Sequence, residues 1–74
     1  MPLYRLRKDK LFLSDYGVFS SYGIDILDSM TNDLLRSVPD ISLEREPVES
    51  LVWLCNHLHL DMIHLDDVIT DFLS

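Results

Sequence analysis

The chain has 74 residues, of which 47% are hydrophobic, and a net charge of −7 from 13 acidic and 6 basic side chains. A chain this short forms one domain with a small core, which leaves little material for a deep, enclosed active site. The hydrophobic fraction is too high for a disordered chain. The negative net charge repels the phosphates of nucleic acids, so we expect no nucleic-acid partner. We expect a single small domain over residues 1–74.

The sequence also bears on location. Cys55 is the only cysteine, which excludes an internal disulfide and favours a reducing compartment. No apolar run reaches the roughly 18 residues of a membrane span, and the N-terminus lacks an apolar stretch of signal-peptide length. We therefore expect a cytoplasmic protein without a membrane partner.

Basic residues are concentrated at the start of the chain. Residues 1–10 hold four basic side chains and one acidic one, whereas the rest of the chain holds two basic and twelve acidic ones. This distribution is typical of a salt-bridged outer strand. It also allows the basic segment to contact an acidic partner.

The first third of the chain predicts two short strands. Residues 3–7 alternate, with Tyr4 and Leu6 on the inward face, as in a half-buried strand. Residues 8–10 are charged and predict a turn, after which residues 11–14 predict a second strand. Beyond these strands, Gly17 is able to adopt a positive φ angle.

The middle of the chain predicts two further strands. Residues 22–26 alternate again, with Ile24 facing inward, and residues 28–33 form a turn-forming cluster. Residues 34–41 predict a weaker strand, and Pro39 near its end indicates the edge of a sheet.

Two amphipathic helices are predicted at the C-terminus, at about residues 46–58 and 62–73. The first begins near Pro47, which is tolerated in a first helical turn, and Asp61 is placed to cap the second. No glycine or proline separates them, but the two apolar stripes differ in phase by roughly 60°, which favours a short joint over one long helix. The stripes consist of Val48, Leu51, Val52, Cys55 and Leu58, and of Leu65, Val68, Ile69, Phe72 and Leu73.

Together these elements predict an α+β fold. We expect an antiparallel meander of three to four short strands at about residues 3–41, followed by a two-helix hairpin packed on one face of the sheet.

Several fragments carry a resemblance to a known family. They are residues 18–24 (VFSSYGI), 54–56 (LCN) and 64–73 (HLDDVITDFL), with residues 40–42 (DIS) ahead of the helices. Together they resemble a family of small uncharacterised proteins, a domain of unknown function, from Clostridia and related Firmicutes. The resemblance extends from about Tyr4 to Leu73 and is most distinctive near the C-terminus. It implies a bacterial cytoplasmic protein, and it implies no activity and no site residue.

The helix junction contains all three histidines and suggests a metal site. Cys55, His57, His59, Asp61 and His64 include every ligand type that zinc uses. If the first helix continued through the junction, His57, Asp61 and His64 would share one face at i, i+4 and i+7. Cys55 lies in an apolar stripe and His59 lies near it, so both are also compatible with core positions. Metal binding by His57, Asp61 and His64 is the alternative function.

Catalysis has weaker support. A thiol enzyme would need a histidine to lower the pKa of Cys55, but an inward-facing cysteine does not reach substrate. Asp66 and Asp67 point in different directions on a helix, which excludes an acid–base pair. We expect no enzymatic activity, no catalytic residue and no cofactor.

Trp53 is the strongest candidate for an interaction residue. It lies opposite the apolar stripe of its helix, in line with Glu49 and His57, while Asp67 and Asp71 occupy the outer face of the second helix. An exposed tryptophan among charged groups is typical of a binding hot spot. The alternative is that another element covers Trp53 and makes it part of the core.

The acidic outer face of the helices allows three interpretations: a solvated surface, docking to a basic protein, or mimicry of nucleic-acid phosphates. We predict a small non-enzymatic interaction or regulatory module that acts through its acidic helical hairpin and a sheet edge. Its partner is another protein or a second copy of the chain.

Overall fold

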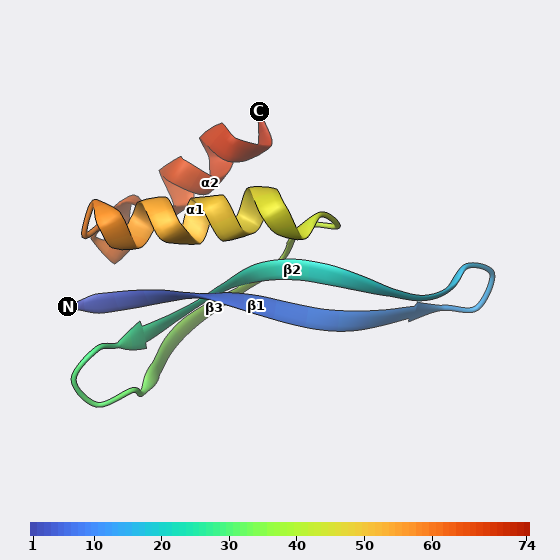
Figure 1. The fold of residues 1–74 in the computed structure, drawn as a ribbon, viewed down its shortest axis with the longest axis horizontal. Coiled ribbons are helices and arrows are strands. Elements are labelled where there is room, and N and C mark those ends of the chain that lie inside the picture. Colours follow the sequence, from blue (N-terminus) through green and yellow to red (C-terminus); the bar gives the residue numbers. More distant parts are fainter.

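The computed structural model describes residues 1–74, and in it three strands precede two helices (Figure 1). This order confirms the predicted α+β fold with three strands, and the two strands predicted at residues 3–7 and 11–14 are parts of one strand. The strands are β1 (Pro2–Leu13), β2 (Gly17–Asp28) and β3 (Leu34–Ser42), and the helical elements are α1 (Arg45–His57), the short 3₁₀ helix η1 (Met62–His64) and α2 (Leu65–Leu73).

The strands form one antiparallel sheet in the order β1-β2-β3, so β1 and β3 are its two edges. The edge position of β3 confirms the interpretation of Pro39. The predicted turn at residues 8–10 is wrong, because β1 runs through it and Lys8 pairs with Tyr22 on β2. The charges in this segment are exposed side chains on a strand and do not mark a chain reversal.

Two turns connect the strands. Between β1 and β2, the backbone N–H of Tyr16 donates to the carbonyl oxygen of Leu13 at 3.0 Å, and Gly17 follows with a φ of 80°. A turn followed by a left-handed glycine is a common three-residue hairpin connection. Between β2 and β3, the carboxylate of Asp28 accepts a hydrogen bond from the N–H of Met30 at 2.8 Å, which confirms the predicted turn cluster and lowers the pKa of Asp28.

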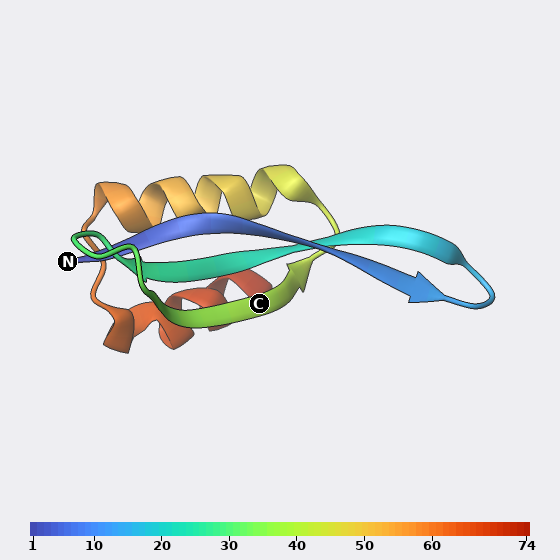
Figure 2. The same cartoon turned by 90° about the horizontal axis from the view of Figure 1, so that it is seen from below.

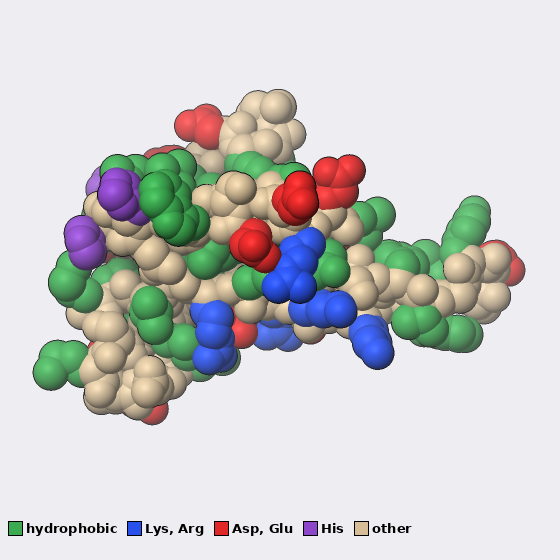
Figure 3. Space-filling model, viewed as in Figure 1, with side chains coloured by type: hydrophobic (Ala, Val, Ile, Leu, Met, Phe, Trp, Pro, Cys, Tyr) green, Lys and Arg blue, Asp and Glu red, His purple; other side chains and the backbone are tan.

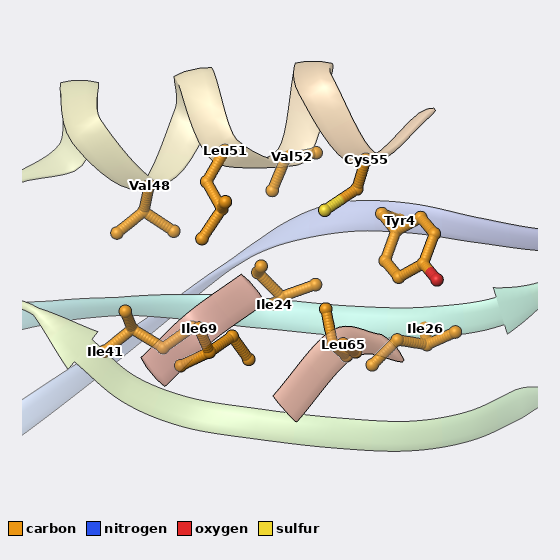
Figure 4. Close-up of a cluster of buried hydrophobic side chains, with 10 residues drawn as sticks. All are labelled: Tyr4, Ile24, Ile26, Ile41, Val48, Leu51, Val52, Cys55, Leu65 and Ile69. Carbon is orange, nitrogen blue, oxygen red and sulfur yellow. The ribbon is translucent and has the colours of Figure 1, made fainter. Parts of the chain in front are cut away.

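Both helices lie on the same face of the sheet and run in opposite directions (Figure 2). Their apolar stripes meet the inward-facing residues of the strands, and Figure 4 shows the side chains that form this core. The predicted stripes are largely confirmed, but Leu58 and Leu73 are exposed because each lies at a helix end. The core consists of Tyr4, Ile24, Ile26, Ile41, Val48, Leu51, Val52, Cys55, Leu65 and Ile69.

The β1–β2 hairpin extends well beyond the helices (Figures 1 and 2). The 13 residues of α1 span about 20 Å, whereas the 12 residues of β1 span about 40 Å, so α1 covers only about half of the hairpin. The third strand also stops short, because its last pair with β2 joins Ser42 to Tyr22. We call residues 10–20, the two-stranded end of the hairpin beyond the Tyr22–Ser42 pair, the arm.

The face of the sheet without helices is polar near its centre. Arg7 forms ion pairs with Asp9 at 2.7 Å and Asp25 at 3.2 Å, and Ser37 donates to Asp25 at 2.8 Å. The carboxylates of Asp9 and Asp25 raise the pKa of the Arg7 guanidinium. Among the four basic residues of residues 1–10, Arg7 alone forms ion pairs, and its partners lie on β1 and β2. The expected salt-bridged strand is therefore present only in part. Neither helix is long and apolar enough to span a bilayer.

Candidate functional site

Trp53 lies on the outer face of α1 and 63% of its surface is exposed. Its position follows from the helical repeat, because the residues of α1 that contact the core, Val48, Leu51, Val52 and Cys55, occupy the opposite face (Figure 4). The alternative that Trp53 belongs to the core is therefore wrong.

Trp53 stacks on His57, one helical turn later. The ring centroids are 4.7 Å apart and the ring planes differ by 9°. Residues at i and i+4 are neighbours on a helix, so the backbone holds the two rings together. They form a flat aromatic surface, and Figure 3 shows histidine side chains beside exposed hydrophobic ones at the end of the molecule opposite to the arm.

Glu49 continues the same line one turn before Trp53. Its carboxylate forms an ion pair with Arg45 at 2.8 Å, which raises the pKa of the Arg45 guanidinium. Both side chains are more than half exposed, so solvent screens the pair and its effect on stability is small. We call Glu49, Trp53 and His57, which are spaced by four residues, the outer row.

The two predicted site residues on α2 are separate from the outer row. Asp67 and Asp71 are exposed, and neither side chain forms a hydrogen bond or an ion pair. The paired carboxylate of α2 is Asp66, which lies 2.7 Å from Arg36. The structure thus joins three of the five predicted residues on one helix and leaves two as unpaired charges on the other.

The histidine-rich junction is a pair of helix caps. The N–H of His59 donates to the carbonyl of Asn56 at 3.2 Å, and the N–H of Leu60 donates to that of Cys55 at 3.0 Å. This Schellman pattern ends α1 and places His59 in the left-handed region, with a φ of 50°. Asp61 then caps η1 by accepting from the N–H of Ile63 at 3.3 Å, which confirms its predicted role.

These caps remove the geometry that the metal hypothesis required. His57, Asp61 and His64 would share one face only on a continuous helix, and the chain reverses between the first two. No group of three or more His, Cys, Asp or Glu side chains lies close enough to hold a metal ion. His59 is exposed, so its interpretation as a core histidine is also wrong.

Cys55 is buried, with 1% of its surface exposed. Burial raises the pKa of its thiol, because the thiolate loses its hydration. Cys55 therefore packs as a small apolar residue and does not face solvent.

The family model described as "Family of unknown function (DUF6514)" matches residues 3–74. The chain belongs to this family. The comparisons with curated proteins and with solved structures gave no match. Membership in DUF6514 confirms the resemblance to a domain of unknown function and assigns no residue a role.

The structure of this DUF6514 member also reveals a contact that the sequence pattern did not indicate. The side-chain amide of Asn56 accepts from the backbone N–H of Tyr4 at 2.8 Å and donates to the carbonyl oxygen of Tyr4 at 2.7 Å. The hydroxyl of Tyr4 donates to the carbonyl oxygen of Leu60 at 2.6 Å. In the sequence, the only indication of this contact was an amide side chain beside an apolar stripe near the end of a helix.

These bonds define how the junction is held. Asn56 pairs with β1 as a neighbouring strand would, and so it closes the sheet edge at Tyr4. Burial raises the pKa of the Tyr4 hydroxyl, and the nearby Cys55 and Asp61 add to the effect. The junction therefore fixes α1 on the sheet and orients the outer row toward solvent.

Proposed function

We propose that this DUF6514 protein is a non-enzymatic interaction module whose docking surface is the outer row of α1. The observation that supports it most is the exposed indole of Trp53, stacked on His57. Tryptophan offers a large contact area with few rotatable bonds, and it is enriched among the residues that dominate binding energies. The stack further limits its freedom, so little side-chain entropy remains to be lost on binding.

The charges around the outer row suggest the chemistry of the partner. Asp67 and Asp71 are unpaired on the neighbouring helix, and the chain as a whole carries a net charge of −7. A partner with an apolar pocket for the indole and basic residues around it would match this surface. The partner is thus a basic protein face, in preference to nucleic acid or a membrane.

Other parts of the proposal rest on weaker support. A single buried cysteine with a raised thiol pKa is compatible with a protein that performs no thiol chemistry in a reducing cytoplasm. The resemblance to small proteins of Clostridia and related Firmicutes favours a bacterial source.

The test compares two single substitutions. Trp53→Ala removes the indole, and Ile63→Ala is the control because Ile63 is also apolar and 77% exposed but lies on η1. The tagged wild-type chain should capture a defined protein from cells of its source, Ile63→Ala should retain it, and Trp53→Ala should lose it. Circular dichroism should show the same fold for all three.

Two outcomes would refute the proposal. Retention of the same partner by Trp53→Ala would remove the docking role of the indole. Unfolding of Trp53→Ala would mean that the side chain supports the core, in conflict with its exposure.

A further inference from the structure

The stack of Trp53 on His57 joins an indole to a ring that changes its charge near neutral pH. Histidine gains a proton as the pH falls from about 8 to about 5. His57 is exposed, so its ring exchanges protons with solvent without any movement of the fold. The outer row therefore contains one position whose charge depends on pH, directly beside its main anchor.

A proton on His57 leaves the stack intact. The two ring centroids are 4.7 Å apart, within the roughly 6 Å over which a cation above the face of an indole is attracted to it. His57 is also the last residue of α1, and a positive charge interacts favourably with the helix dipole at that end. Protonation thus changes the charge of the stack and keeps its geometry.

No other charged group neutralises this position. None of the four ion pairs of the chain includes a histidine. On α1 itself, Glu49 is paired with Arg45. The charged groups of the neighbouring elements are His59, Asp61 and His64 of the junction, the three aspartates of α2, and Arg5 and the amino terminus of β1. A proton on His57 therefore presents a full positive charge to a bound partner.

We propose that the stack makes the docking surface sensitive to pH, with the basic partner held tightly while His57 is neutral and more weakly once His57 gains a proton. The inference rests on the proposed function and adds the regulation of the same site. A basic partner that matches the negative charge of this chain meets a like charge at the stack when the pH falls.

The expected effect is moderate. Like charges about 4 Å apart repel by about 1 kcal/mol in water, which weakens binding about fivefold. The indole and its contact area are unchanged, so protonation of His57 tunes the affinity and does not abolish docking.

The first experiment needs no partner. Trp53 is the only tryptophan of the chain, so the intrinsic fluorescence reports on the stack alone. An imidazolium quenches the emission of an indole in contact with it, and therefore the emission should fall between about pH 8 and pH 5.5. His57→Phe is the matched control, because it keeps a ring against the indole but gains no proton. Its emission should stay constant over this range.

The second experiment measures the affinity for the protein that the tagged chain captures, at about pH 7.5 and at about pH 5.5. The wild-type chain should bind about fivefold more weakly at the lower pH, and His57→Phe should lose none of this affinity. His57→Arg keeps a planar cation on the indole at every pH, so it should bind weakly in both buffers. His59 and His64 are present in all three chains, and their protonation cancels in the comparison. Circular dichroism at both pH values should show the same fold.

Two results would overturn the inference. One is an emission of the wild-type chain that does not change with pH, or that changes equally in His57→Phe. The other is an equal loss of affinity in the wild type and in His57→Phe. Constant emission in a chain that loses its partner on Trp53→Ala would refute the pH response alone. A stack that titrates in a chain whose Trp53→Ala variant keeps its partner would refute the docking role, and with it the regulation of docking.

Discussion

The covered and uncovered halves of the β1–β2 hairpin belong to the same two strands but differ in environment. On the covered half, Ile24 and Ile26 are fully buried under the helices, whereas Phe12 and Val18 on the arm are mostly exposed. Both pairs occupy the same side of the same strands. The length of the helical layer thus sets which apolar side chains on this side of the hairpin are buried.

Replacement of a core residue should have the largest effect in this comparison. Ile24→Ala should lower the free energy of unfolding by about 4 kcal/mol, because it removes buried methyl groups and leaves a cavity. Val18→Ala, on the adjacent part of the same strand, should change it by less than about 0.5 kcal/mol. Urea unfolding measures both changes in the free energy of unfolding. Equal losses would contradict the difference between the two halves.

The two glycines of β2 allow a second comparison. A Cβ atom at Gly23 would overlap the carbonyl oxygen of Val38 on β3, whereas one at Gly17 would meet open space and only the strain of a φ of 80°. We expect Gly23→Ala to lower the free energy of unfolding by about 3 kcal/mol, because the added methyl group displaces β3. Gly17→Ala should cost about 1 kcal/mol. Thermal unfolding of both variants shows which one loses more stability. A larger loss of stability in Gly17→Ala would be inconsistent with the structure.

The Asn56 contact should have an intermediate effect. Asn56→Asp removes the N–H donor to the carbonyl of Tyr4 and places a carboxylate beside that oxygen. The free energy of unfolding should fall by about 2 kcal/mol near neutral pH. Chemical unfolding measures the loss. If Asn56→Asp were as stable as the wild type, Asn56 would not close the β1 edge.

Replacement of the residue that caps the end of α1 should have the smallest effect, and it should stabilise the protein. His59 has a positive φ that L residues adopt at a cost and glycine adopts freely. His59→Gly should therefore raise the free energy of unfolding by about 1 kcal/mol. The same substitution on a continuous helix would destabilise it, so a lower melting temperature would argue against the joint.

Much of the covered half was predictable from the sequence. The positions of Ile24, Val48 and Leu65 in periodic patterns predicted their burial, and the phase difference between the two helical stripes predicted the joint. The outward position of Trp53 on its helix followed from the same helical phase, but whether another element covered it did not. Each of these features depends on neighbours in the sequence, which is why periodicity revealed them.

The arm was not predictable in the same way. Residues 8–10 carry charges although they belong to strand β1, and the same polarity is typical of turns. The contact between Tyr4 and Asn56 joins residues 52 positions apart, so no local pattern contains it. The metal hypothesis for His57, Asp61 and His64 failed for a related reason: it required a continuous helix, and the left-handed His59 carries no glycine signal.

Backbone hydrogen exchange along the hairpin tests most directly whether the helical layer divides it into two halves. In dilute solution, the amides of residues 24–27 should exchange only on global unfolding, and those of residues 11–13 and 18–20 should exchange much faster. Uniform protection along the whole hairpin would contradict the account.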